Sequence, residues 1–115
     1  MPFFRIQTNR EMEDRAKEEF FTRATVFVAS TLGKPEKVVM VELDTGRDMS
    51  FAGTTEPAAY VELKSIGLPA VSLNDYATRI FKFLQEELAV PPDRVFVDFA
   101  DLPRERFAWN GKTFG

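Results

Sequence analysis

The chain has 115 residues, 44% of them hydrophobic, with 15 basic and 18 acidic side chains and with neither histidine nor cysteine. This length fits one domain with one core. Without cysteine there can be no disulfide, thiolate nucleophile or cysteine-based zinc site, and the lack of histidine disfavours most other transition-metal sites, so we expect no cofactor. The mixed, slightly acidic charge argues against a nucleic-acid partner.

The N-terminal region carries charged residues throughout and lacks the apolar segment of a signal peptide, and no stretch approaches the length of a membrane span. We therefore expect a soluble cytoplasmic protein with no membrane partner. Secretion without a signal peptide is left open.

The first half of the chain predicts strand, helix and strand in that order. Residues 3–8 alternate between apolar and polar side chains, as in a strand that begins at the N-terminus. From about 13 to 32, apolar residues recur at helical spacing, and Gly33 and Pro35 end this amphipathic helix. The apolar run in 37–43 suggests a short strand covered on both faces.

The second half predicts the same order again. Residues 58–65 alternate as a strand, and a second amphipathic helix runs from Ser72, a candidate N-cap, to Leu88. Residues 95–99 form a fourth strand. The aromatic tail contains Asn110-Gly111, a typical tight-turn dipeptide.

The two halves are similar in sequence. A shift of 56 positions superposes Leu32 on Leu88, Pro35 on Pro91, Val39 on Val95, Val41 on Val97, Glu42 on Asp98 and Leu43 on Phe99. We therefore predict a single domain, 1–115, with pseudo-repeats at about 2–43 and 58–99. The fold class is α/β (α+β), with duplicated β-α-β units forming a four-stranded mixed sheet that carries two helices on one face.

The predicted strands contain many apolar positions, which two helices would not cover alone. They are Phe4, Ile6, Val39, Val41, Val61, Leu63, Val95 and Val97. We expect an oligomer that buries sheet faces and edges, and the alternative is a monomer with a small apolar patch.

Pro2 and Lys34 are the candidate catalytic residues. Loss of Met1 would leave Pro2 with a secondary amine on a rigid strand, and an α-amino group titrates near neutral pH even without a special environment. A desolvated, neutral amine can accept a proton, and Lys34 could bind a substrate carboxylate and lower the pKa of that amine. Alternatively, Met1-Pro2 has no special meaning and Lys34 is an ordinary cation at a helix end. Glu42 and Asp98, equivalent in the repeat, are candidate acids or rim ion-pair partners.

Several motifs, in order along the whole chain, resemble one known family. They are Pro2, Thr8-Asn9, Gly33-Lys34-Pro35, the segment 51–57, Ser65-Ile66-Gly67, the segment 92–95, Trp109-Asn110 and Phe114. This set is similar to the macrophage migration inhibitory factor (MIF) family of the tautomerase superfamily. The resemblance implies a homotrimer around a central barrel, with active sites at subunit interfaces. It also implies cofactor-independent keto-enol tautomerisation of phenylpyruvate-like 2-keto acids and dopachrome derivatives.

The same resemblance implies roles for individual residues. Pro2 matches the general base, Lys34 binds the substrate carboxylate, and the backbone N–H of Ile66 assists. The residues implied to line the pocket from the same chain are Phe3, Lys64, Ser65, Trp109 and Phe114. Those implied to come from a neighbouring subunit are Phe96, Asp98 and Phe107.

The chain departs from animal members of this family at several positions. Phe96 and Val38 replace pocket tyrosines, and Asp98 replaces an asparagine, so substrate preference and rate are expected to differ. Ala58 and Val61 stand where those members carry a Cys-x-x-Cys pair, which excludes a thiol-disulfide oxidoreductase activity. Two readings remain beside the enzyme: a cytokine-like or host-interaction protein that binds a cell-surface receptor, and a small-molecule-sensing module.

Overall fold

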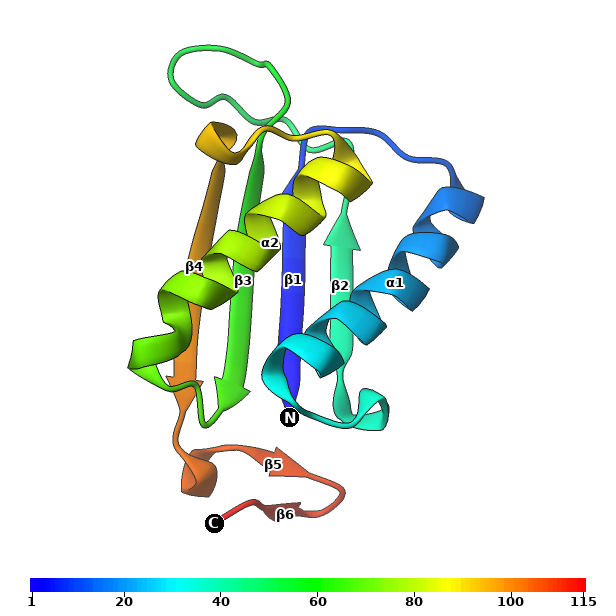
Figure 1. The fold of residues 1–115 in the computed structure, drawn as a ribbon. Helices are drawn as coiled ribbons and strands as arrows, with labels where there is room; N and C mark the ends of the chain where they lie inside the picture. The colour runs from blue at the N-terminus through cyan, green and yellow to red at the C-terminus, as the bar shows by residue number, and fades with distance from the viewer.

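The computed structural model describes residues 1–115, which form one four-stranded sheet with two helices on one face (Figure 1). The main elements are β1 (Pro2–Thr8), α1 (Asp14–Leu32), β2 (Met40–Asp44), β3 (Ala59–Ile66), α2 (Leu73–Leu88) and β4 (Val95–Leu102). The strand order is β2-β1-β3-β4. β1 is parallel to β2, β3 is parallel to β4, and the central pair is antiparallel. The predicted β-α-β-β-α-β arrangement is thus confirmed.

The core lies between the sheet and the helices. Alternation along β1 buries every second side chain, including Phe4 and Ile6, on the helix side. On the helices, Phe20 and Leu84 are completely buried. The rings of Phe27 and Phe83 stack with centroids 4.3 Å apart, which joins α1 to α2 over the sheet.

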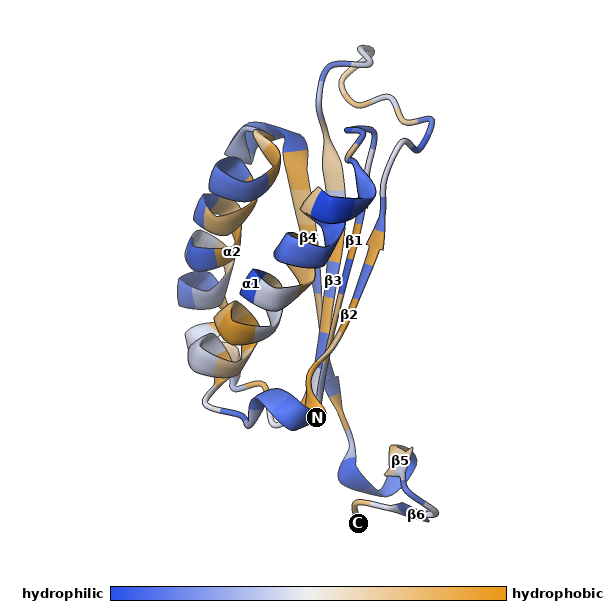
Figure 2. Ribbon diagram, turned by 90° about the vertical axis from the view of Figure 1, so that its right-hand side faces the viewer, coloured by the Kyte–Doolittle hydropathy of each residue, from blue (hydrophilic) through white to orange (hydrophobic).

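The apolar strand positions that suggested an exposed apolar face belong to this core. Phe4, Ile6, Val61, Leu63 and Val95 are buried in it, and the other three pack against it. The open face of the sheet instead carries charged residues, among them Arg5, Glu42 and Glu62, and hydrophobic and hydrophilic residues alternate along the strands in Figure 2. The prediction that two helices could not cover these residues is therefore wrong, because strand alternation directs seven of them to one side and Val39, just before β2, packs against the same core.

Arg5 occupies the centre of the open face. Its guanidinium forms ion pairs with Glu42 of β2 at 3.7 Å, Asp44 at 3.8 Å and Glu62 of β3 at 3.5 Å. Glu42, Arg5, Glu62 and Asp98 follow one another across the four strands in register. The ion-pair interpretation of Glu42 is thus confirmed, and Asp98 accepts a hydrogen bond from the Tyr60 hydroxyl at 3.2 Å.

Two local predictions are corrected. The 37–43 segment begins with a 3₁₀ turn, Glu36–Val38, because Pro35 fixes an extended entry, and the strand starts only at Met40. β2 lies at the edge of the sheet. It is also not covered on both faces, because Met40 is 57% exposed. Ser72 is not a side-chain cap: it ends the 3₁₀ turn Ala70–Ser72 in a right-handed helical conformation and makes no capping hydrogen bond.

The C-terminal segment forms a small hairpin beyond the end of the sheet (Figures 1 and 2). β5 (Ala108–Trp109) pairs antiparallel with β6 (Lys112–Thr113). Asn110 and Gly111 both have positive φ, 53° and 92°, as a two-residue hairpin turn requires. This confirms the predicted turn. No helix of the structure has both the length and the hydrophobicity needed to cross a membrane.

Candidate functional site

Pro2 lies at the end of the sheet where β1 begins. It is the first residue of β1, it pairs in register with Ser65 of β3, and its side chain is buried. Met1 precedes it, so the Pro2 nitrogen belongs to a peptide bond in this structure. The strand-anchored position predicted for Pro2 is confirmed, and any amine formed there would be held by the sheet.

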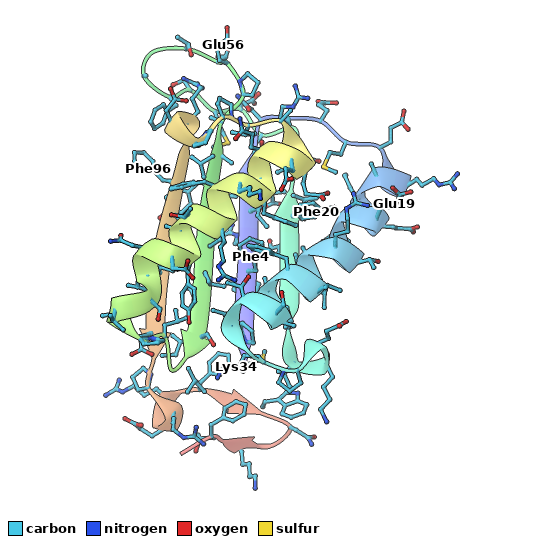
Figure 3. All side chains as sticks on the ribbon, in the orientation of Figure 1. Phe4, Glu19, Phe20, Lys34, Glu56 and Phe96 are labelled. Atoms are coloured by element: carbon cyan, nitrogen blue, oxygen red, sulfur yellow. The ribbon has the colours of Figure 1, made fainter.

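Lys34 reaches the same end of the molecule from the end of α1 (Figure 3). Gly33 ends the helix in the left-handed conformation at φ 66°, and the Lys34 backbone N–H donates to the Ala29 carbonyl at 3.0 Å. The ammonium donates to the backbone carbonyl of Ile66 at 3.4 Å. The side chain therefore turns to β3, not to the carbonyls of its own helix.

No carboxylate neutralises Lys34. None of the eight ion pairs of the chain involves Lys34. A half-buried ammonium held only by a neutral carbonyl keeps its charge available for an anion. Burial, followed by the positive charge of Lys34, lowers the pKa of the Met1 amine below its usual value of 8.0.

An apolar cavity of about 420 Å³ opens beside the chain terminus. Its lining residues are Met1, Phe3, Met40, Lys64, Leu102, Phe107, Ala108 and Trp109. A smaller hollow of about 130 Å³ adjoins it, because Met1, Met40 and Trp109 line both. Phe114 stacks parallel to Phe107 and Trp109, with ring centroids 5.9 and 6.5 Å apart, and so supports the aromatic wall.

Another hollow, of about 530 Å³, is larger but is made mainly of polar loop residues such as Asn9 and Arg47. Asn9 follows the far end of β1, seven positions from Pro2. Met49 is the one hydrophobic residue among those that line this hollow. We place the candidate site at the terminus because Met1 lines the apolar cavity and the Lys34 ammonium acts on the Met1 amine, although Lys34 itself is not a lining residue.

The Ile66 carbonyl, at this end of the sheet, accepts two side-chain hydrogen bonds. It accepts from the Ser65 hydroxyl at 3.2 Å as well as from the Lys34 ammonium. The Ser65 side chain is fully buried and thus holds the Ile66 peptide instead of lining the cavity. Ser65 is therefore not among the lining residues of this cavity, and the pocket role expected for it stays a prediction.

Three residues expected from a neighbouring subunit differ in where they lie. Phe96 and Asp98 are not brought to Pro2 within this chain: they lie on β4, in register with Tyr60 and Glu62, and Figure 3 shows Phe96 at the opposite end of the sheet from Lys34. Phe107, in contrast, lines the cavity of its own chain. Phe107 follows the 3₁₀ turn Arg104–Arg106 and lines this cavity together with Trp109, and its contribution to a neighbouring subunit stays a prediction.

Sequence reasoning missed Met40, Leu102 and Ala108 as lining residues. Met40 lies within the predicted strand 37–43 and Leu102 lies beyond the predicted strand 95–99, which the structure extends to Leu102, and only their positions at the ends of β2 and β4 reveal the cavity. It also missed Asp101, whose carboxylate accepts two backbone N–H groups in the turn after Ile66. An acid near a strand end, opposite a glycine turn, was the available signal.

Comparisons with known proteins agree with this arrangement. The family model described as "Macrophage migration inhibitory factor (MIF)" matches residues 1–115. A macrophage migration inhibitory factor homolog of Brugia malayi is 37% identical over 116 residues, covering all of both chains, and the factor of Rattus norvegicus is 32% identical over 99% of each. The crystal structure of a homologue from Prochlorococcus marinus superposes with a TM-score of 0.90 at 36% identity, over 98% of this chain and 99% of that one. The chain therefore belongs to the macrophage migration inhibitory factor family.

Proposed function

We propose that this protein is a cofactor-independent keto-enol tautomerase, an isomerase of phenylpyruvate-type 2-keto acids, in which the amine of Pro2 is the general base after Met1 is removed. The observation that carries the proposal is the unneutralised Lys34 ammonium beside the chain terminus and an apolar, aromatic-walled cavity. An anionic head with an aromatic body matches these two features. Family membership supports the same reaction class.

In the proposed reaction, Lys34 binds the substrate carboxylate and the cavity receives the ring. The neutral Pro2 amine takes a proton from C3, the C3–H electron pair forms the C2=C3 bond, and the C2=O π pair moves to the oxygen. The oxygen takes a proton from water to give the enol, and the protonated Pro2 amine returns its proton to the hydroxide that is left. The reverse sequence returns the ketone. A positioned base of this kind contributes roughly 10²- to 10⁴-fold, and carboxylate binding adds orientation.

The proposal depends on the amine being neutral. In the structure, burial and Lys34 both lower the pKa of the Met1 amine. An amine on Pro2 would lie one residue further along, on a ring that is already buried, so we expect the same two causes to act on it. The base would then be available near neutral pH.

We propose that the site is completed only in a homotrimer. Phe96 is 58% exposed and Asp98 is exposed on the edge strand β4, so both are accessible to a second copy of the chain. The resemblance implies that a neighbour presents them to Pro2. Light scattering that gave a monomeric mass would contradict this part of the proposal.

The experiment follows the ultraviolet absorbance of the phenylpyruvate enol in protein whose intact mass shows loss of Met1. We expect Pro2→Gly, or a chain that retains Met1, to lose roughly 10²-fold or more in kcat/KM. Pro92→Gly, an exposed proline of the 3₁₀ turn Pro92–Arg94, is the matched control and should keep full activity. Unchanged rates in Pro2→Gly would refute the assignment. No turnover of several keto acids together with saturable binding to a cell-surface receptor would favour the cytokine-like alternative.

A further inference from the structure

We propose that Asp101 is a positioning residue for the substrate carboxylate, acting through the turn after β3 on the ammonium of Lys34. This inference rests on the proposed function, because it assumes that Lys34 binds the carboxylate. Asp101 itself is absent from the cavity lining.

The carboxylate of Asp101 holds the turn that follows β3. Its Oδ1 atom accepts the backbone N–H of Gly67 at 3.1 Å and that of Leu68 at 3.0 Å. Both donors would otherwise lack a partner in a turn where Gly67 has a φ of 74°. These two hydrogen bonds to one oxygen fix the peptide planes on either side of Gly67.

This turn also fixes the orientation of the Ile66 carbonyl, which accepts the hydrogen bond from Lys34. Ile66 comes directly before Gly67, is itself buried, and pairs with Leu102 at the end of β4. Its carbonyl carbon is bonded to the Gly67 nitrogen, so the N–H that Asp101 accepts and the carbonyl that Lys34 contacts belong to one planar peptide group. A rotation of that group would move the only hydrogen-bond acceptor that the structure gives the Lys34 ammonium.

This chain of contacts has few alternatives. Lys34 forms no ion pair, and Ser65, the other donor to the Ile66 carbonyl, contacts only the oxygen and not the far side of the peptide. Asp101 is exposed and forms no ion pair either, and its carboxylate accepts only these two backbone N–H groups. Loss of the acceptor should therefore loosen the ammonium and weaken substrate binding more than it slows proton transfer.

The test compares Asp101→Ala with Asp101→Asn in the phenylpyruvate assay, because both remove the same charge and only asparagine keeps an acceptor oxygen. We expect Asp101→Ala to raise KM about tenfold with kcat changed less than threefold, and Asp101→Asn to stay within about twofold of wild type in both. Equal KM values in the two variants, or a loss confined to kcat, would overturn the proposal.

Lys34→Met, assayed alongside, separates this inference from the proposed function. If Lys34→Met leaves KM unchanged, the carboxylate anchor itself is wrong. If it raises KM and Asp101→Ala does not, only the positioning role of Asp101 is wrong. Should Asp101→Ala fail to fold, Asp101→Glu, which keeps the charge but shifts the oxygens by one methylene, is expected to raise KM in its place, and a wild-type KM would again overturn the proposal.

Discussion

Replacing Lys34 with methionine removes one charge from the candidate site and little else. The two side chains have similar length, and Lys34 has no carboxylate partner that its loss would leave unpaired. The Ile66 carbonyl still accepts from the Ser65 hydroxyl at 3.2 Å. We therefore expect the melting temperature of Lys34→Met to stay close to that of the wild type.

The effect on substrate binding should be large. A hydrogen bond to a charged group contributes about 1.5 to 3 kcal/mol. Because about 1.4 kcal/mol corresponds to a tenfold change, loss of the Lys34 contact with a carboxylate should raise KM by roughly 10- to 150-fold. The enol absorbance of phenylpyruvate, followed over a range of concentrations, gives this value.

The pH dependence of the same variant has a definite sign. Burial first and Lys34 second lower the pKa of the Met1 amine, and we expect the same order for an amine on Pro2. Methionine would then remove only the second cause, and the pKa of the Pro2 amine would rise part of the way back. The base is active when neutral, and activity therefore increases as pH rises through this pKa. In Lys34→Met the ascending limb of kcat/KM should move to higher pH than in the wild type.

Lys82→Met is the matched control, because Lys82 is exposed on α2, outside every cavity lining, and makes no ion pair. It should reproduce the wild-type KM and pH profile. A wild-type KM in Lys34→Met would refute the role of Lys34 as the carboxylate anchor. An ascending limb displaced to lower pH would refute the effect of Lys34 on the pKa of the amine.

Two other predictions test the cavity and the core. Trp109→Ala should raise KM for phenylpyruvate about tenfold, and in the wild type the ligand should quench the fluorescence of this single tryptophan; an unquenched signal at saturation would mean that the ring binds elsewhere. Phe20→Ala should lower the free energy of unfolding in urea by about 3 to 5 kcal/mol because the ring is fully buried. Phe21→Ala, with a side chain that is 37% exposed, should cost clearly less, and equal losses would contradict the assigned core.

Most of the fold could be predicted from the sequence because its periodicities are strong. Alternation in β1 and β3 and the helical stripes of α1 and α2 each reflect one buried face, and the Asn110-Gly111 turn has its own conformational signature. The errors came where a pattern does not specify a neighbour. The apolar run before Leu43 is compatible with a central or an edge strand, and only the observed pairing shows that β2 is at the edge.

The candidate site was predicted less completely. Lys34 and Pro2 could be singled out by residue type, but the lining residues Met40 and Leu102 owe their place to register between distant strands. Asp101 acts by accepting backbone N–H groups, which leave no trace in side-chain patterns. Interactions between side chain and main chain are thus the part of the site that sequence reasoning reads least well.

The long segment between β2 and β3 is also held by bonds of this kind, at the end of the molecule where Figure 3 places Glu56. The Arg94 guanidinium donates to the carbonyls of Pro57 at 2.8 Å, Phe51 at 3.1 Å and Glu56 at 3.1 Å, and the Asn9 amide donates to Glu56 at 2.9 Å. Every acceptor is a main-chain oxygen, which all amino acids share. The loop can therefore exchange its exposed side chains during evolution without losing these hydrogen bonds. Arg94 and Asn9, which both lie outside the loop, leave its surface chemistry free to diversify.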